Sequence, residues 1–485
     1  MGDSRFVSDH VRENRSLGLQ SSVSSSLVAL LLHLIGRSQL ASEQKQSTLD
    51  QQLDDYETRP VPENVTRNWV DQTLVWAGIT FCLAAWFAGG ALTAGFGFYE
   101  TLLVLVCGAV ILVAMGALSG WIGATTRLST AMNCRFAFGR EGSKILGVVL
   151  SISLWGWFAF QAGLFGLTLQ IGLKQGFGWD VPVEVLIFLG GIGMMTTAIV
   201  GYRGMSWLSR WAVPLMAILA LWALISTLMT HSWAEIAAKG PLGQPLPFMS
   251  GVAAVVGSYA VGATISSDIS RYSRRRSDSQ LAALWGLGIT FVPIFWLGSI
   301  FAFAWGDPNI VNVMTVKLGL GIFAYITLFL AQWTTNQSNL YSSALGLSAV
   351  IPWPKWRLAL AIGIVSTIIG TFQLYNSFVQ FLILLSALIP PILGTLVADY
   401  YLFNSRLYKW ENIGKLKPVN WIAVISWLTG SVVGVLLGVV NIAPDFSAIF
   451  PVPLAAMLTA VVVHAALTVA MRGSKAEYPS ALEAA

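Results

Sequence analysis

The chain has 485 residues, of which 55% are hydrophobic and only 11% are charged, and its formal net charge is +5. Soluble domains carry about 25% charged residues. This composition, with a mean hydropathy of +0.68, indicates a polytopic membrane protein and excludes a soluble globular domain. The three cysteines, Cys82, Cys107 and Cys134, show neither metal-ligand spacing nor the pattern of a disulfide framework, and packing is the expected role of Cys82 and Cys107.

The N-terminal residues are polar and precede the membrane region. Their apolar stretch, 27–35, is too short to span a bilayer, which takes about 20 residues. A surface amphipathic helix at 21–37 is one interpretation, and a disordered tail or a start codon placed too far upstream is the favoured one. We expect a cytoplasmic tail at 1–58, a membrane domain at 59–472 and a cytoplasmic C-terminal tail at 473–485.

Apolar runs long enough to cross a bilayer, bounded by charged residues, Pro or Gly, recur through the membrane domain. They lie near 74–96, 100–124, 145–172, 181–201, 206–229, 247–270, 279–305, 322–347, 357–373, 378–403, 420–440 and 450–472. These twelve runs, numbered here as spans 1 to 12, predict an all-α membrane protein with twelve transmembrane helices.

Lys and Arg are concentrated in the loops that follow even-numbered spans. Those loops carry Arg127, Arg135, Arg140, Lys144, Arg203, Arg271, Arg274, Arg275, Arg276, Lys355, Arg357, Arg406, Lys409, Lys415 and Lys417. The other loops hold the isolated Lys174, Lys239 and Lys317. Because basic loops stay in the cytoplasm, the even loops and both termini are predicted to be cytoplasmic, in a plasma (inner) membrane protein. Topology thus explains the arginine run after span 6 without a nucleic-acid partner.

Span 8 carries a polar cluster inside an apolar run, from Gln332 to Asn339. Each amide or hydroxyl there costs on the order of kilocalories per mole if hydrocarbon leaves it unpaired, so these groups must face protein, water or a ligand. The cluster contains no carboxylate, Lys or Arg. It suits the binding of an uncharged polar solute and a small cation better than acid–base catalysis.

One face of span 8 combines hydroxyls with a small residue. Ala331, Thr334, Thr335 and Ser338 stand at positions i, i+3, i+4 and i+7 of a helix. Hydroxyls and backbone carbonyls are the hard, neutral oxygen ligands that Na+ accepts. The alternative is that the hydroxyls bond to their own helix or join two helices, which explains the threonines but not the amides beside them.

Spans 1 and 6 are rich in glycine, at Gly78, Gly89, Gly90, Gly257 and Gly262. Unwound segments in transporter helices free carbonyls for cations, and two segments five spans apart fit corresponding positions in two five-helix repeats. The alternative is that the small residues form helix-packing faces. The pattern alone leaves both interpretations open.

Span 3 places Trp157 and Gln161 one turn apart on the same face. An indole offers a stacking surface and an amide offers a paired donor and acceptor, which together suit a flat heterocycle. The alternative is a tryptophan in the core or in the interfacial belt.

Ionisable residues inside the spans are few. Arg210, Glu184, Asp268 and Asp399 lie near span ends, and His464 is in the last span. A proton pump usually carries a chain of carboxylates at mid-membrane, and none is evident here. We therefore interpret His464 as a structural residue.

Several motifs in a characteristic order run from about residue 56 to 472. They are Arg59-Pro60-Val61-Pro62, Gly257-Ser258-Tyr259, Asp268-Ile269-Ser270-Arg271-Tyr272, Trp333-Thr334-Thr335-Asn336, Leu340-Tyr341, Tyr375-Asn376-Ser377-Phe378, Ala387-Leu388-Ile389-Pro390-Pro391 and Ala398-Asp399-Tyr400. On these motifs the chain resembles the nucleobase–cation symporter-1 family, and within it the bacterial cytosine-permease branch. The resemblance implies a core of two inverted five-helix repeats, with discontinuous helices 1 and 6 and two further C-terminal helices.

The resemblance also implies cation-coupled uptake of a small heterocycle by alternating access, in a monomer that is no enzyme and needs no cofactor beyond the coupling ion, Na+ or H+. Carried over by position, a sodium site would use backbone oxygens of Gly78, Phe81 and Ala331 with the hydroxyls of Thr334 and Thr335.

By the same resemblance, the heterocycle would stack between Trp157 and Tyr259. Its edge would bond near Ser258 and to the span 8 amides of Asn336 and Asn339.

The chain departs from the cytosine permeases at three polar positions, which here are Leu154, Val261 and Ala331. Gln161 and Asn336 instead match the hydantoin-transporting branch, although that branch's more distal asparagine aligns with Leu340, leaving the neighbouring Asn339 as a substitute. Each lost bond is worth about 1–3 kcal/mol, enough to change specificity.

We therefore expect a neutral planar nucleobase or related heterocycle, such as cytosine, with hydantoin, allantoin, uracil and thiamine-precursor pyrimidines as alternatives. A channel or facilitator should show a continuous polar lining, whereas this sequence shows a localised patch. An integral-membrane enzyme should show a metal motif or paired carboxylates, which the sequence lacks.

Overall fold

The computed structural model describes Tyr56 and residues 59–472, except for 201, 320, 349, 352 and 354. The regular elements of this part are all helices, and its single β-bridge, between Arg67 and Ser273, is isolated. The expected tails, Tyr56 aside, and the amphipathic helix considered at 21–37 lie outside the described residues.

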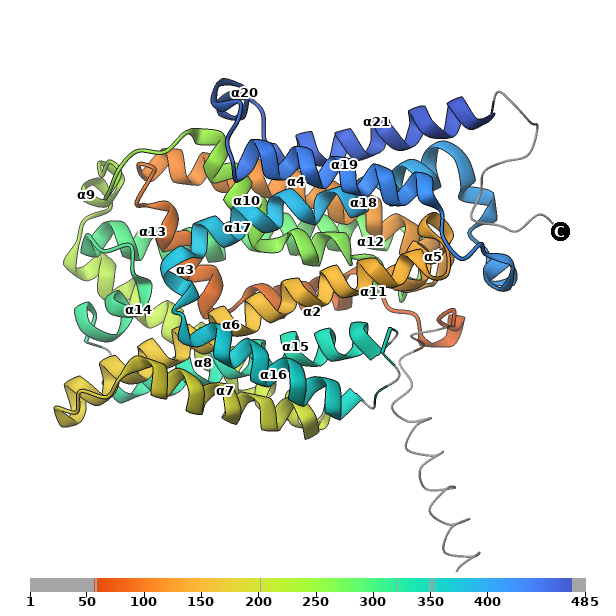
Figure 1. Cartoon of the computed structure of the whole chain (residues 1–485). Coiled ribbons are helices and arrows are strands. Elements are labelled where there is room, and N and C mark those ends of the chain that lie inside the picture. Colours follow the sequence, from red (N-terminus) through yellow and green to blue (C-terminus); the bar gives the residue numbers. More distant parts are fainter. Residues whose placement is uncertain are drawn as a thin grey trace, which may run out of the picture. The chain divides into compact units, whose positions relative to one another are not determined.

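The helices follow one another through the membrane domain (Figure 1). The longer ones are α2 (Trp69–Thr80), α3 (Leu83–Leu92), α4 (Phe98–Thr126), α6 (Gly142–Phe177), α7 (Val183–Val200), α8 (Tyr202–Thr230), α10 (Phe248–Thr264), α13 (Phe291–Trp305), α15 (Gly321–Ser348), α16 (Lys355–Thr371), α17 (Phe378–Leu388), α19 (Trp421–Gly438) and α21 (Val452–Arg472). The shorter ones are α5 (Thr130–Phe138), α9 (Trp233–Ala237), α11 (Ser267–Ser270), α12 (Arg276–Ala283), α14 (Ile310–Asn312), α18 (Pro390–Val397) and α20 (Pro444–Ile449).

Among the described residues, seven helical segments are long and apolar enough to cross a membrane, and four shorter apolar helices accompany them. Each of these segments falls on one predicted span. Span 8 corresponds to α15, which carries the polar cluster. The structure therefore establishes an all-helical, multi-pass membrane architecture, and the count of twelve stays a prediction.

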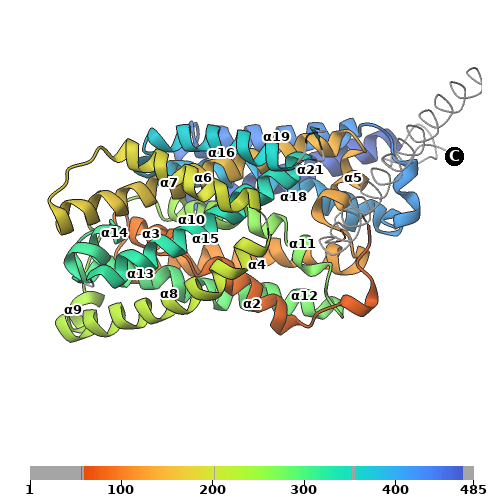
Figure 2. The same ribbon diagram turned by 90° about the horizontal axis from the view of Figure 1, so that it is seen from below.

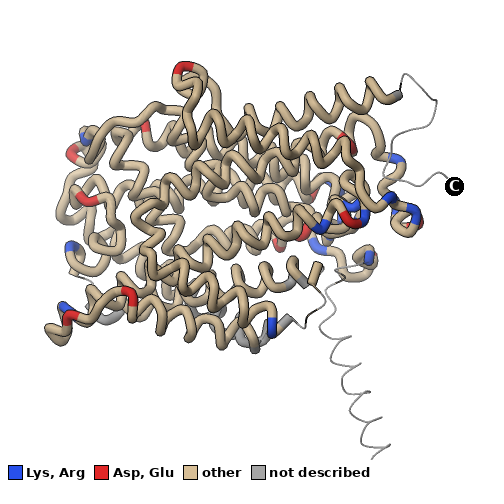
Figure 3. The backbone as a smooth tube through the Cα atoms, in the orientation of Figure 1, with Lys and Arg blue, Asp and Glu red and all other residues tan. Residues whose placement is uncertain are grey.

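Lys and Arg residues gather at one end of the helices, the end at which α5 and α11 lie (Figures 1 and 3). We call it the basic end. The loops that meet there follow α4 and α11 and precede α19, although they are far apart in sequence. The alternation of basic loops along the chain thus corresponds to a concentration of Lys and Arg at one end in space.

One set of helices, the first helix group, comprises α2, α3, α4 and α10 to α13. Its members pack α4 against α10 and α3 against α13 (Figures 1 and 2). The Ser119 hydroxyl donates to the Thr264 carbonyl at 2.7 Å, and the Ser267 hydroxyl donates to the Ser119 carbonyl at 2.6 Å. The Ser299 hydroxyl likewise donates to the Gly89 carbonyl at 2.8 Å. Small hydroxyls thus satisfy one another across close helix contacts, as membrane packing favours.

A second helix group comprises α6, α7, α15 and α16, with α6 side by side with α15. The hydroxyls of Ser151 and Ser343 each donate to the other's carbonyl, at 3.1 and 3.2 Å. The indole of Trp155 donates to the Ser343 hydroxyl at 2.7 Å, and that of Trp333 donates to Thr197 at 2.8 Å. These bonds join α6 to α15 and α15 to α7 within the second group.

The glycine-rich segment of span 6 is helical throughout, because α10 continues through Gly257 and Gly262 and ends at Thr264. A Cβ added at Gly257 would lie 1.8 Å from the Leu382 carbonyl oxygen, so the backbones of α10 and α17 meet there. Gly257 therefore serves close helix packing, the alternative considered for the glycines of span 6. In span 1, by contrast, α2 ends at Thr80 and α3 begins at Leu83.

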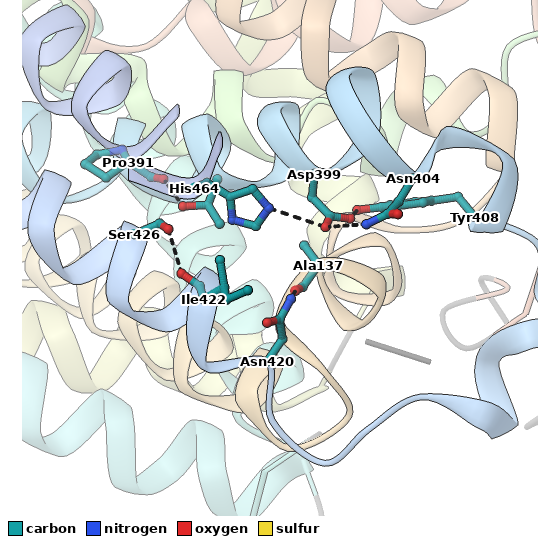
Figure 4. A network of polar contacts seen from close by, with 10 residues as sticks. Ala137, Pro391, Asp399, Asn404, Tyr408, Asn420, Ile422, Ser426 and His464 are labelled. Atoms are coloured by element: carbon teal, nitrogen blue, oxygen red, sulfur yellow. Dashed lines mark hydrogen bonds and ion pairs between the residues drawn. The ribbon is translucent and has the colours of Figure 1, made fainter. Parts of the chain in front are cut away.

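A buried polar network joins the last helix, α21, to the segment around Asp399 (Figure 4). The carboxylate of Asp399 accepts bonds from the Asn404 amide at 2.9 Å and the Tyr408 hydroxyl at 2.7 Å. His464 of α21 lies 3.4 Å from the same carboxylate. The sequence showed no partner for this imidazole, and the structure supplies one, which agrees with a structural role for His464.

We expect Gly257→Ala to lower the thermal unfolding midpoint of the purified protein. The added methyl meets the Leu382 backbone, and overpacking of this kind costs about 1–3 kcal/mol. The matched control is Gly176→Ala in α6, where no atom lies within 4 Å of the added Cβ. An unchanged midpoint for Gly257→Ala would contradict the close approach of α10 and α17.

Candidate ligand and cation site between spans 1, 3, 6 and 8

The span 8 amides face protein rather than lipid, as the energetic argument requires. Gln332, Asn336 and Gln337 are each fully buried. The Gln332 amide donates to the Thr168 hydroxyl at 3.2 Å, and the Asn336 amide donates to the Phe158 carbonyl at 3.2 Å. Both acceptors belong to α6, so the polar face of α15 lies on the helix that carries Trp157 and Gln161.

Gln161 is the most unusual polar side chain in this region. It is fully buried, and neither its amide nitrogen nor its amide oxygen has a hydrogen-bond partner. The side-chain oxygen of Asn336 is also buried without a partner. Asn336 bonds to the backbone carbonyl of Phe158, about one turn before Gln161 on α6.

Leaving one such group unpaired costs about 1–3 kcal/mol. An unpaired donor beside unpaired acceptors is therefore a site that a polar ligand would satisfy.

Trp157 is half-buried and belongs to an aromatic cluster. Its ring centroid lies 5.7 Å from that of Phe160, 6.0 Å from that of Phe378 and 5.7 Å from that of Phe381, all edge to face. Phe160 and Phe378 stack on each other at 4.1 Å. The indole is thus held by ring edges contributed by α6 and α17.

Tyr259 points to other partners. Its hydroxyl bonds to that of Thr80 at 3.3 Å, and its ring lies 6.1 Å from that of Trp76 and 5.7 Å from that of Phe291. Trp157 and Tyr259 therefore have separate ring neighbours in this structure. A heterocycle stacked between them stays a prediction.

The two remaining candidate contacts are Ser258 and Asn339. The Ser258 hydroxyl donates to the Val255 carbonyl at 2.7 Å and lines a cavity, with Ala88 and Leu382, that has room for about one water molecule. Asn339 is half-buried and stands one turn beyond Asn336 on α15. Ser258 belongs to α10, a different helix from the one that carries the amides.

The interruption of span 1 frees the two carbonyls expected to bind a cation. In a continuous helix the Gly78 carbonyl would accept from the Cys82 amide and the Phe81 carbonyl from the Ala85 amide. Instead the Cys82 amide donates to Thr80 at 2.9 Å, and the Ala85 amide donates to Cys82 at 3.1 Å. The Gly78 and Phe81 carbonyls thus lose their usual helical donors.

The other expected ligands converge on α15. The hydroxyls of Thr334 and Thr335 donate to the Ala331 carbonyl at 2.9 and 3.1 Å. This is the back-bonding alternative, and it gathers three oxygens at one point of the helix. In the part of the chain that the structure describes, no cluster of three or more His, Cys, Asp or Glu side chains offers a metal site. The arrangement suits a hard monovalent cation.

Cys82 connects the two parts of this site. It is buried at the interruption of span 1, and its thiol lies near the Thr335 hydroxyl. The sequence predicted only a packing role for Cys82, and the structure adds its contact with Thr335. In the sequence, the position of Cys82 next to Phe81, in a segment expected to unwind, was the feature that could have indicated such a contact. The contact joins the first helix group to the second.

We expect substitutions of two buried polar residues to shift stability in opposite directions without ligand. Gln161→Leu removes two unpaired polar atoms, so the thermal midpoint should stay or rise. Ser151→Ala removes the bond to the Ser343 carbonyl and should lower it, by the loss of about 1 kcal/mol. Thermal unfolding of both purified variants tests this, and a lower midpoint for Gln161→Leu would show that its amide is satisfied in the free protein.

The comparisons with known proteins agree with this architecture. Residues 60–463 match the family model described as a permease for cytosine/purines, uracil, thiamine and allantoin. The cytosine permease of Escherichia coli (strain K12) is 31% identical over 383 residues, which cover 77% of this chain and 87% of the relative. The hydantoin permease of Microbacterium maritypicum is 24% identical over 398 residues, which cover 76% of this chain and 80% of the relative.

Solved structures show the same fold. Mhp1, a nucleobase–cation-symport-1 family transporter, in a closed conformation with bromovinylhydantoin bound, superposes with a TM-score of 0.70 at 20% identity, covering 86% of this chain and 96% of Mhp1. Its inward-facing conformation gives a TM-score of 0.71 at 21% identity. The protein is therefore a multi-pass membrane transporter rather than an enzyme. It belongs to the nucleobase–cation symporter-1 family and is similar to the cytosine permeases within it.

Proposed function

We propose that this protein is a secondary active transporter that imports a neutral planar nucleobase or related heterocycle in symport with Na+ or H+, by alternating access. The observation that carries the proposal is the unpaired, fully buried amide of Gln161 beside Trp157. A polar group kept without a partner in a membrane protein is explained by a ligand that supplies the partner.

The substrate would lie among side chains of three helices. Trp157 offers the stacking surface, and Gln161 and Asn336 offer donors and acceptors to the edge of the ring. Ser258, Tyr259 and Asn339 complete the proposed contacts from α10 and α15. None of these six side chains is charged, so the ligand they match is neutral.

The relatives of this chain indicate which classes of substrate to consider. These relatives include cytosine and hydantoin permeases and thiamine transporters. Leu154 and Val261 stand where cytosine permeases carry polar residues, and both pack in one apolar cluster with Trp157. A heterocycle related to cytosine, rather than cytosine itself, fits this wall better.

The coupling ion would bind where the two helix groups meet. Gly78, Phe81 and Ala331 contribute carbonyls, and Thr334 and Thr335 contribute hydroxyls that rotate from the Ala331 carbonyl toward the ion. Five neutral oxygens favour Na+, and H+ is the alternative.

We further propose twelve transmembrane helices arranged as two inverted repeats of five plus two, in a monomer in the plasma membrane. The basic end would face the cytoplasm, which the clustering of Lys and Arg supports (Figure 3). The interruptions at Phe81–Cys82 and at Ile265–Ser266 would be the discontinuities of helices 1 and 6. Each lies five spans from the other.

Binding to the purified protein tests the function directly. Thermal shifts would be measured with cytosine, uracil, uric acid, xanthine, allantoin, hydantoins and thiamine-type pyrimidines, each with and without Na+. We expect stabilisation by at least one heterocycle, larger in Na+ because ligand and ion bind the same folded state. A shift indifferent to Na+ would move the coupling to H+, and no shift for any compound would contradict the proposed substrate class.

The cation site makes a separate prediction for Thr335. Thr335→Val keeps the side-chain shape and removes the hydroxyl, so uptake into proteoliposomes should need at least tenfold more Na+ for half-maximal rate, equivalent to about 1.4 kcal/mol. Thr335→Ser keeps the hydroxyl and is the matched control, with near-normal Na+ dependence. Equal Na+ dependence in the wild type and both variants would remove Thr335 from the site.

A further inference from the structure

An apolar seam borders Trp157 on the side away from Gln161. It combines residues from three helices and their ends: Leu150, Leu154 and Trp157 of α6, Val261 of α10 with Ile265 just after it, and Phe381 and Leu385 of α17 with Ile389 just after it. Val261, Leu385 and Ile389 are buried, and the others are partly buried against them.

Along α6, an apolar, an aromatic and a polar side chain therefore follow one another. Leu154 precedes Trp157 by about one turn and Gln161 follows it by about one turn, so all three lie on the same face. With a rise of 1.5 Å per residue, Leu154 and Gln161 are separated by roughly 10 Å along the helix. A six-membered ring stacked on the indole thus meets an amide at one edge and the seam at the other.

The α17 side of the seam lies directly on α6. A Cβ added at Gly156 would be 2.5 Å from the Phe381 ring, so that ring occupies the space beside Trp157. The Phe381 and Trp157 ring centroids are 5.7 Å apart. The edge of the site next to Leu154 is thus closed by rings and aliphatic groups, where an amino or carbonyl group would lose its bonds to water without replacement.

We propose, on the basis of the proposed function, that the transported heterocycle carries an apolar substituent, at least a methyl group on a ring carbon. The substituent lies against Leu154, Val261 and Phe381, while the polar edge of the ring bonds to Gln161 and Asn336. The substrate class is a C-alkylated planar heterocycle rather than an unsubstituted base.

Matched pairs of ligands test this inference. Dissociation constants would be measured for the wild type with cytosine, uracil and hydantoin and with each of their derivatives methylated at a single ring carbon. Burial of one methyl group predicts about fourfold tighter binding for one methylated derivative over its own parent ring. Parent rings that bind as tightly as, or more tightly than, every methylated derivative would overturn the inference.

Two substitutions at Val261 separate polarity from size. Val261→Thr has nearly the same shape and adds a hydroxyl, so the preference for the methylated derivative should fall to parity or reverse. Val261→Ala stays apolar and leaves more room, so the preference should remain and extend to an ethyl group. Thermal unfolding without ligand confirms that both variants are folded.

The outcomes distinguish this inference from the function on which it rests. Tighter binding of a methylated ring, lost in Val261→Thr and kept in Val261→Ala, supports it. A preference that is the same in both variants overturns the assignment of the substituent to the seam. Absence of binding by every ring, methylated or not, overturns the proposed function and this inference together.

Discussion

The constraint on which this structure depends is that hydrocarbon offers no hydrogen bonds. Every polar group inside the membrane must find a partner in the protein, in trapped water or in a ligand. The hydroxyls of Ser119, Ser267, Ser151 and Ser343 all donate to backbone carbonyls of neighbouring helices. Other described residues also bury a polar atom without a partner, and Gln161 differs from them in leaving both atoms of its amide unpaired. This is why the proposed site is centred on Gln161.

The same constraint organises the chain into two groups of helices. The serine bonds described above lie within one group or the other, whereas the Cys82–Thr335 contact joins the two beside the freed carbonyls of span 1. A cation bound there would replace that contact with stronger ones to both groups. Binding of the ion and the relative position of the groups would then be linked, which is what coupling in a transporter requires.

Periodicity and the distribution of charge predicted the membrane class, the position of the helices and the basic end, because each depends on composition over about twenty residues. Pairings between distant segments were not predictable in this way. His464 had no visible partner until folding placed Asp399 beside it, and Cys82 had no visible role until Thr335 lay next to it. The glycines likewise did not predict where a helix is interrupted. Gly257 lies at a helix contact, and the interruption of span 1 falls at Phe81 and Cys82, which are not glycines.

Specificity follows from which contacts are absent as much as from which are present. The amide of Gln161 would favour a ligand that can both donate and accept a hydrogen bond, because a ligand without such groups would leave the amide unpaired. An apolar wall at Leu154 and Val261 acts in the opposite sense, because it penalises a polar edge and gains little from a bare ring carbon. The two walls lie on either side of one indole. A single ring stacked there, as we propose, would be oriented by its own polarity, which would let a site of few side chains discriminate among closely related heterocycles.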